Sequence, residues 1–244
     1  MITLRYIALA LLVCVVALSG CGGEQPAEEA ALHTAAPADT GELAPPSPGK
    51  AFKAERMANA LRGLTYDGGR VVVDTTNAAP LPDAEAFDTA AQAHQRGLYY
   101  IFEKNDRVAA IGALTRAVIM EPGNPDYLAD LGQALLRKGK REEAVAAFNT
   151  ALDIAPKHFP AQKQMAWALQ MGGDYEGARQ AWLKVLDLDG TDGEAWGRLA
   201  VVEYYLEDYA GAWERVQRAR EHGYTMPPQF LPLLEAKMPE PANA

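Results

Sequence analysis

Apolar and small residues recur every 34 residues from residue 91 onward. Ala144, Ala178 and Ala212 are separated by this interval, and so are Tyr175 and Tyr209. Within each interval the apolar positions follow a helical period. A repeat of this length predicts pairs of antiparallel helices that stack on one another, because a single pair cannot bury its own apolar face.

One interval, Pro125–His158, carries a complete set of small and large positions. They are Leu128, Leu131, Gly132, Leu135, Ala144, Phe148, Ala151 and Pro156. Gly132 and Ala144 are small enough for the two helices to touch, Phe148 fills the space beside that contact, and Pro156 ends the second helix. The set resembles the tetratricopeptide repeat. The resemblance implies an all-α solenoid of helix-turn-helix units that serves as a binding scaffold.

The same register extends to both sides of this interval. We expect three well-formed repeats, at 125–158, 159–192 and 193–226, after a degenerate repeat at 91–124. In the degenerate repeat, Gly97 and Leu98 occupy the leucine and small-residue positions with their characters exchanged.

Two further segments flank the repeats. Segment 50–90 predicts a helix over Ala51–Arg62 and then a small irregular element, in which Leu64–Tyr66 and the β-branched run Val71–Val73 pair across a glycine turn. Segment 227–244 predicts a helix and a tail. The helix starts at Pro227-Pro228, runs to about Lys237 and covers the end of the stack through Phe230, Leu233 and Leu234.

The first 20 residues have the pattern of a bacterial signal peptide. Arg5 supplies a positive charge, and the apolar run Ile7–Leu18 is shorter than the roughly 20 residues of a membrane span. Leu18-Ser19-Gly20-Cys21 resembles the lipobox, which implies cleavage before Cys21 and attachment of acyl chains such as palmitate to it; an ordinary secretory signal is the alternative. Gly22 indicates the outer membrane, facing the periplasm, with the inner membrane as the alternative.

Residues 21–49 are predicted to form the lipidated N-terminus and a disordered tether. They contain five prolines and no aromatic residue, so they cannot bury enough surface to offset their ordering entropy. A flexible chain of this length has a reach on the order of 30 Å. We expect the tether to hold the folded body away from the membrane.

Composition and spacing argue against nucleic-acid binding and catalysis. The formal charge is −9, whereas phosphate binding requires clustered Lys and Arg. Both cysteines, Cys14 and Cys21, lie in the first 21 residues, and the four histidines show no paired-ligand spacing. The acidic turn around Asp187–Glu194 lacks the glycine and glutamate that an EF-hand loop requires. We therefore expect no enzyme, no metal and no cofactor.

The candidate functional site is the inner surface that the first helix of each repeat would line. The resemblance places these partner-binding residues on it: Tyr99, Phe102, Gln133, Leu136, Arg137, Lys163, Trp167, Gln170, Met171, Val201, Tyr204 and Tyr205. Arg137 and Lys163 are isolated cations among aromatic and flexible apolar side chains. The clamp of chaperone-binding repeats is missing, because Ala129 and Gln133 stand at its first two positions.

These features predict a lipid-anchored periplasmic adaptor or scaffold that binds protein partners in cell-envelope assembly. The expected ligand is an extended or helical segment of a partner protein, held mainly by apolar contacts. A structural subunit that self-associates through its repeats, without a peptide client, remains the alternative.

Overall fold

The computed structural model describes residues 55–74, 76 and 87–241. The chain divides into two compact units, Met1–Pro45 and Pro46–Ala244, and the described residues all belong to the second. The predicted signal peptide (1–20), Cys21 and the predicted tether (21–49) lie outside the described residues. Of the predicted N-terminal helix (51–62), residues 55–62 are described: residues 55–60 are helical, and residues 61 and 62 already belong to a turn.

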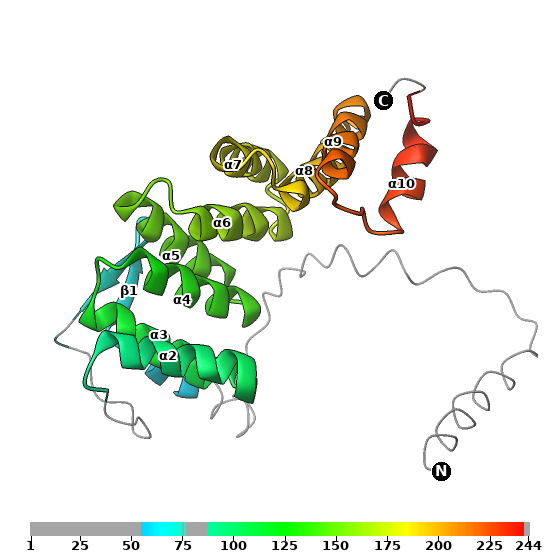
Figure 1. Cartoon of the computed structure of the whole chain (residues 1–244). Helices are drawn as coiled ribbons and strands as arrows, with labels where there is room; N and C mark the ends of the chain where they lie inside the picture. Colours follow the sequence, from blue (N-terminus) through cyan, green and yellow to red (C-terminus); the bar gives the residue numbers. More distant parts are fainter. Residues whose placement is uncertain (1–54, 75, 77–86, 242–244) are drawn as a thin grey trace, which may run out of the picture. The chain divides into compact units, whose positions relative to one another are not determined.

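After the helical residues 55–60, the described chain forms a β-hairpin and then helices that pack in successive pairs (Figure 1). The hairpin is formed by β1 (Leu64–Asp67) and β2 (Arg70–Val73). The helices are α2 (Ala90–Tyr99), η2 (Tyr100–Lys104), α3 (Arg107–Met120), α4 (Pro125–Arg137), α5 (Arg141–Ile154), α6 (Phe159–Met171), α7 (Tyr175–Leu188), α8 (Gly193–Tyr205), α9 (Tyr209–Glu221) and α10 (Phe230–Lys237). The predicted helix-turn-helix repeat fold is confirmed.

Helix starts recur at the 34-residue interval. Side chains of Asn124, His158 and Asp192 cap α4, α6 and α8 by accepting backbone N–H groups of the first turn. Side chains of Asp106, Asp174 and Asp208 do the same for α3, α7 and α9. Such caps satisfy N–H groups that have no partner inside the helix. Lys140 stands at the equivalent place before α5 and makes no side-chain cap.

A small residue on the first helix of a pair faces a large residue on the second. A Cβ at Gly132 of α4 would lie only 2.5 Å from Cε1 of Phe148 on α5. Phe148 is completely buried, and Trp182, its equivalent one repeat later, is 1% exposed. The glycine therefore lets the aromatic ring fill the space between the helices at the density of a protein core.

The first helix pair corrects the predicted register. A Cβ at Gly97 would lie 2.5 Å from Cγ of Leu114, and Leu114 is the equivalent of Phe148. Gly97 is therefore the small residue of this pair, and the predicted exchange of Gly97 and Leu98 is wrong. Because Gly97 lies 35 rather than 34 positions before Gly132, the first helix carries one extra residue. The π-helical turn η2 takes up that residue before α3 begins.

Successive junctions between repeats use equivalent positions. The Nη1 of Arg107 donates to the carbonyl oxygen of Arg137 (3.2 Å), and the Nη1 of Arg141 donates to that of Met171 (3.3 Å). A cation at the carbonyl end of a helix is favourable. At the next junction this contact is replaced by a stack of Tyr175 on Tyr205, with ring centroids 4.6 Å apart.

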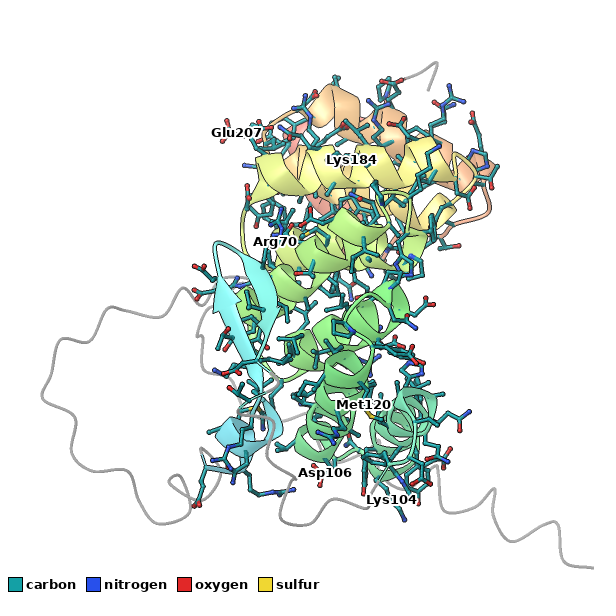
Figure 2. All side chains as sticks on the ribbon, turned by 90° about the vertical axis from the view of Figure 1, so that its left-hand side faces the viewer. Arg70, Lys104, Asp106, Met120, Lys184 and Glu207 are labelled. Carbon is teal, nitrogen blue, oxygen red and sulfur yellow. The ribbon has the colours of Figure 1, made fainter. Side chains whose placement is uncertain are left out.

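The predicted hairpin is present and packs on α5. Its strands pair in antiparallel register, with β1 opposite β2 along their whole length. The Val71 N–H donates to Oγ1 of Thr150 (2.9 Å), and Arg70, labelled in Figure 2, forms an ion pair with Asp153. Since Val71 is buried in the same cluster as the first repeats, the hairpin extends their hydrophobic core across α5.

The C-terminal helix α10 starts later than predicted. Pro227-Pro228 lies in the preceding turn, where the Phe230 N–H donates to the carbonyl oxygen of Pro227. Phe230 and Leu234 share one helix face and are buried, whereas Leu233 is 50% exposed. The predicted covering role of Leu233 is therefore wrong, since half of its surface stays exposed although it lies only three residues from the buried Phe230.

Candidate functional site

Side chains from three successive first helices, α4, α6 and α8, together with Trp182 of α7, line a pocket of about 370 Å³. Its lining residues are Gln133, Leu136, Arg137, Lys163, Gln164, Trp167, Met171, Trp182, Glu194 and Arg198. We call it the Trp167 pocket. It combines an apolar surface with two side-chain amides and several charges, groups that a protein ligand can contact.

Trp167 supplies the aromatic surface of the pocket. The guanidinium of Arg198 lies 4.2 Å from the centroid of the Trp167 ring, a favourable cation–π geometry. Met171 is 60% exposed, and Leu136 is half-buried. Apolar area on α4 and α6 therefore remains available to a ligand.

Lys163 is held by two acidic residues at the start of α8. Its Nζ lies 2.7 Å from Oδ2 of Asp192 and 2.9 Å from Oε2 of Glu194. Burial by itself would lower the pKa of Lys163, but these carboxylates outweigh it and raise the pKa. Burial would likewise raise the pKa of Glu194, but Lys163 and Arg198 hold it below its usual value. The predicted isolation of Lys163 is wrong, because its partners come from the next repeat.

Arg137 differs from the other pocket cations. Its side chain is exposed and forms no ion pair with any residue that the structure describes. It ends α4, and Lys138, Lys140 and Arg141 follow within four residues. Of these, Lys140 pairs with Glu143 at 2.9 Å. The α4 side of the pocket therefore presents a cation that an external carboxylate can reach.

The pocket brings together half of the residues that the repeat pattern indicated. Gln133, Leu136, Arg137, Lys163, Trp167 and Met171 line it. Gln170 does not: its Oε1 accepts the indole N–H of the buried Trp182 at 3.1 Å. Gln170 therefore orients a core residue of α7.

The predicted residues of α8 contribute to packing. Tyr204 contacts Phe230 of α10, with ring centroids 5.8 Å apart. Tyr205 stacks on Tyr175, and Val201 packs against the C-terminal core cluster. They do not line the Trp167 pocket, because Val201 and Tyr204 pack toward the C-terminal core and Tyr205 packs on α7.

Tyr99 and Phe102 also lie away from the pocket, with 38% and 68% of their surface exposed. The extra residue in the first helix explains this, since it shifts the register there by one position. With this shift, His94 and Leu98 occupy the repeat positions that the unshifted register would give to Gln95 and Tyr99. His94 faces the next repeat, where its Nε2 lies 2.6 Å from Oδ2 of Asp130.

Four lining residues had no counterpart in the sequence prediction: Gln164, Trp182, Glu194 and Arg198. Gln164 and Arg198 occupy the same repeat position, 34 residues apart, so a wider set of repeat positions would have included them. Trp182 is also the large core residue of its pair. Glu194 lines the pocket and pairs with Lys163 of the preceding repeat. The residue pattern within one repeat does not show such a contact between repeats.

The described residues contain no group of three His, Cys, Asp or Glu side chains that could hold a metal ion. In the acidic turn before α8, the carboxylate of Asp189 is bound within the turn itself. It accepts hydrogen bonds from the N–H and hydroxyl of Thr191 (2.9 and 2.6 Å). Among the helices of the described chain, none combines the length and apolarity needed to cross a membrane.

Comparison with known proteins agrees with this fold. The sequence profile of the tetratricopeptide repeat matches residues 102–167 and 135–199. A heat-shock protein cognate (HSC) co-chaperone, sgt12, of Aspergillus fumigatus is 26% identical over 115 residues, 47% of this chain and 32% of that protein. The small glutamine-rich tetratricopeptide repeat-containing protein 2 of Saccharomyces cerevisiae is 27% identical over 150 residues, 62% of this chain and 41% of that protein. The alignments thus span less than half of these relatives.

Solved structures share the arrangement of helices. MamA of Desulfovibrio magneticus superposes with a TM-score of 0.53 at 22% identity, over 57% of this chain and 77% of that chain. A tetratricopeptide repeat protein of Parabacteroides merdae superposes with a TM-score of 0.51 at 22% identity, over 61% and 59%. The chain therefore carries tetratricopeptide repeats, a scaffold class that mediates protein–protein interactions, and the matched profile indicates no enzyme family.

Proposed function

We propose that the protein is a lipid-anchored periplasmic adaptor that binds a segment of a cell-envelope protein in the Trp167 pocket. The observation that carries this proposal is the pocket itself, in which exposed Met171 and the Trp167 ring adjoin an arginine without an ion-pair partner in the described chain. Aromatic, methionine and arginine side chains are the usual anchors of protein interfaces. The co-chaperone name of one relative is consistent with a partner-binding role.

The proposed location rests on the N-terminal sequence. Leu18-Ser19-Gly20-Cys21 has the spacing of a lipoprotein signal, and acyl chains on Cys21 would anchor the chain at about 0.8 kcal/mol per buried CH₂. Residues 21–49 would serve as the tether between membrane and repeats. Gly22 favours the outer membrane over the inner one.

Site-specific photocrosslinking in the producing cells tests this proposal. In the full-length chain, p-benzoyl-phenylalanine replaces Met171 in one variant and Leu183 in another. Both positions are apolar and exposed (60% and 39%), but Leu183 lies on α7 and does not line the pocket. We expect an adduct with an envelope protein from position 171 only, and its loss when Trp167→Ala is added.

Two outcomes would contradict the adaptor. An adduct between two copies of the chain would favour a self-associating structural subunit instead. Equal adducts from both positions would show that binding does not depend on the pocket. Circular dichroism of the Trp167→Ala chain must show unchanged helicity, so that lost crosslinking reports binding and not unfolding.

A further inference from the structure

We propose that the Trp167 pocket selects acidic segments, in which an Asp or Glu side chain lies within a few residues of a large apolar one. The inference rests on the proposed adaptor function and specifies its ligand. It follows from the distribution of charge, hydrogen-bonding groups and apolar surface within the pocket.

The charges on the α8 side of the pocket are already matched. The carboxylate of Glu194 is shared by Lys163 at 2.9 Å and Arg198 at 3.3 Å. Lys163 also binds Asp192, at 2.7 Å. Two cations and two carboxylates thus neutralise one another, and this side provides no strong site for a charged ligand.

The α4 side carries an unmatched positive charge. Arg137 has no ion-pair partner among the described residues, and Lys138 and Arg141 follow it one and four positions later in the chain. This basic turn belongs to a chain of formal charge −9, so its local sign is opposite to that of the protein as a whole. An arginine fork binds a carboxylate through two parallel hydrogen bonds, and the opposite charges also steer the encounter.

Apolar and amide groups lie beside this cation. Leu136 and Met171 contribute exposed or half-buried aliphatic surface, and Trp167 contributes its ring. The side-chain amides of Gln133 and Gln164 form no hydrogen bond with a described residue. An amide both donates and accepts, so each can pair with the backbone of an extended segment. The pocket therefore matches a peptide with an apolar side chain and a nearby carboxylate. A basic side chain of a peptide would find no unpaired carboxylate among the lining residues.

Selection from a random-peptide display library tests this specificity without a known partner. The full-length chain is used in three forms: wild type, Arg137→Gln and, as a matched control, Lys184→Gln. Lys184 is exposed on α7, outside the pocket lining (Figure 2), so its substitution makes the same change in net charge. We expect wild type and Lys184→Gln to enrich Asp or Glu near Leu, Met or Phe, and Arg137→Gln to keep the apolar preference and lose the acidic one.

A synthetic peptide from the enriched set then gives the size of the effect. Arg137→Gln should weaken its binding at least about tenfold, the expected loss for one charge-assisted pair. Replacing the peptide's acidic residue by its amide should cause a similar loss with the wild-type chain, and little further loss with Arg137→Gln, because the two changes remove the same interaction.

The outcomes separate this inference from the adaptor proposal. Enrichment of neutral or basic sequences, or an acidic preference that survives Arg137→Gln, overturns the inference and leaves the adaptor standing. The same library is also selected on the Trp167→Ala chain. If the wild-type chain enriches no sequence above that selection, the pocket does not bind peptides and both proposals fail.

Discussion

Phe148 of α5 occupies the space that a side chain on Gly132 of α4 would need. A Cβ at Gly132 would lie 2.5 Å from Cε1 and 2.8 Å from Cδ1 of the phenylalanine ring. Leu114 stands in the same relation to Gly97 in the preceding pair. In these two pairs the separation of the helices is thus set by one glycine and one large side chain.

Gly132→Ala should therefore destabilise the protein. The added methyl group must displace a completely buried ring, and overpacking of this kind costs about 1–3 kcal/mol. Urea unfolding monitored by circular dichroism measures the change. Gly123→Ala is the control, since a Cβ there meets no atom within 4 Å; it should be neutral or stabilising by up to about 1 kcal/mol. Equal effects at the two positions would contradict the packing argument.

Lys140→Asp should stabilise the protein. Asp106, Asp174 and Asp208 cap α3, α7 and α9 from the equivalent position, whereas Lys140 leaves the start of α5 without a side-chain cap. A new cap contributes about 1 kcal/mol, and the partly exposed Lys140–Glu143 pair that is lost contributes less. Thermal unfolding measures the gain. Lys140→Ala removes the same ion pair without adding a cap and should not raise the melting temperature.

Stability should depend on pH through Glu194. Burial opposes ionisation of Glu194, but Lys163 and Arg198 outweigh it and hold its pKa below the usual value. Ionised Glu194 therefore stabilises the fold above the ordinary glutamate pKa of about 4.3, and this contribution disappears as the pH falls through the lowered folded-state pKa. The stability difference between wild type and Glu194→Gln should be largest near pH 7.

Urea unfolding from pH 7 down to pH 3 follows that difference. It should shrink at the acid end of the series and should be smaller throughout in a Lys163→Gln background, because the carboxylate has then lost its nearest cation. A difference that stays constant with pH would show that the ionised Glu194 carboxylate does not stabilise the fold.

Cys21→Ala should abolish lipid attachment. If Leu18-Ser19-Gly20-Cys21 is the processing signal, the variant should keep its N-terminal segment and incorporate no labelled palmitate. Mass spectrometry and metabolic labelling measure both effects. Cys14→Ala, inside the predicted signal segment, should behave as wild type. Normal cleavage and release of the Cys21→Ala protein would contradict the lipid anchor.

The repeat register could be predicted from sequence because it depends on residue size. Small residues such as Gly132 and Ala144 must recur where two helices touch, and a large residue such as Phe148 must recur beside them. The 34-residue interval is therefore directly visible in the sequence. The extra residue in the first helix could not be placed in this way. Its position depends on the packing of Leu114 against Gly97, and η2 accommodates the additional residue.

The candidate site was predictable only in part, for a related reason. Side chains that the repeat pattern places on the inner surface, such as Trp167 and Met171, line the pocket. The ion pairs of Lys163 could not be derived, since Asp192 and Glu194 come from the next repeat. The packing of Tyr204 likewise depends on Phe230, which lies outside the repeats.

Because the hairpin packs on α5, local unfolding should require more free energy in the N-terminal repeats than in the C-terminal ones. In a stack of repeats most contacts join neighbours, so unfolding can begin at an end and proceed stepwise. The bond from Val71 to Thr150 joins residues 79 positions apart, and the ion pair of Arg70 with Asp153 reinforces it. Because the hairpin, α3, α4 and α5 also share one hydrophobic core, we expect them to open as one cooperative unit. Amide hydrogen exchange should therefore be fastest in α10 and α9 and slowest in α4 and α5.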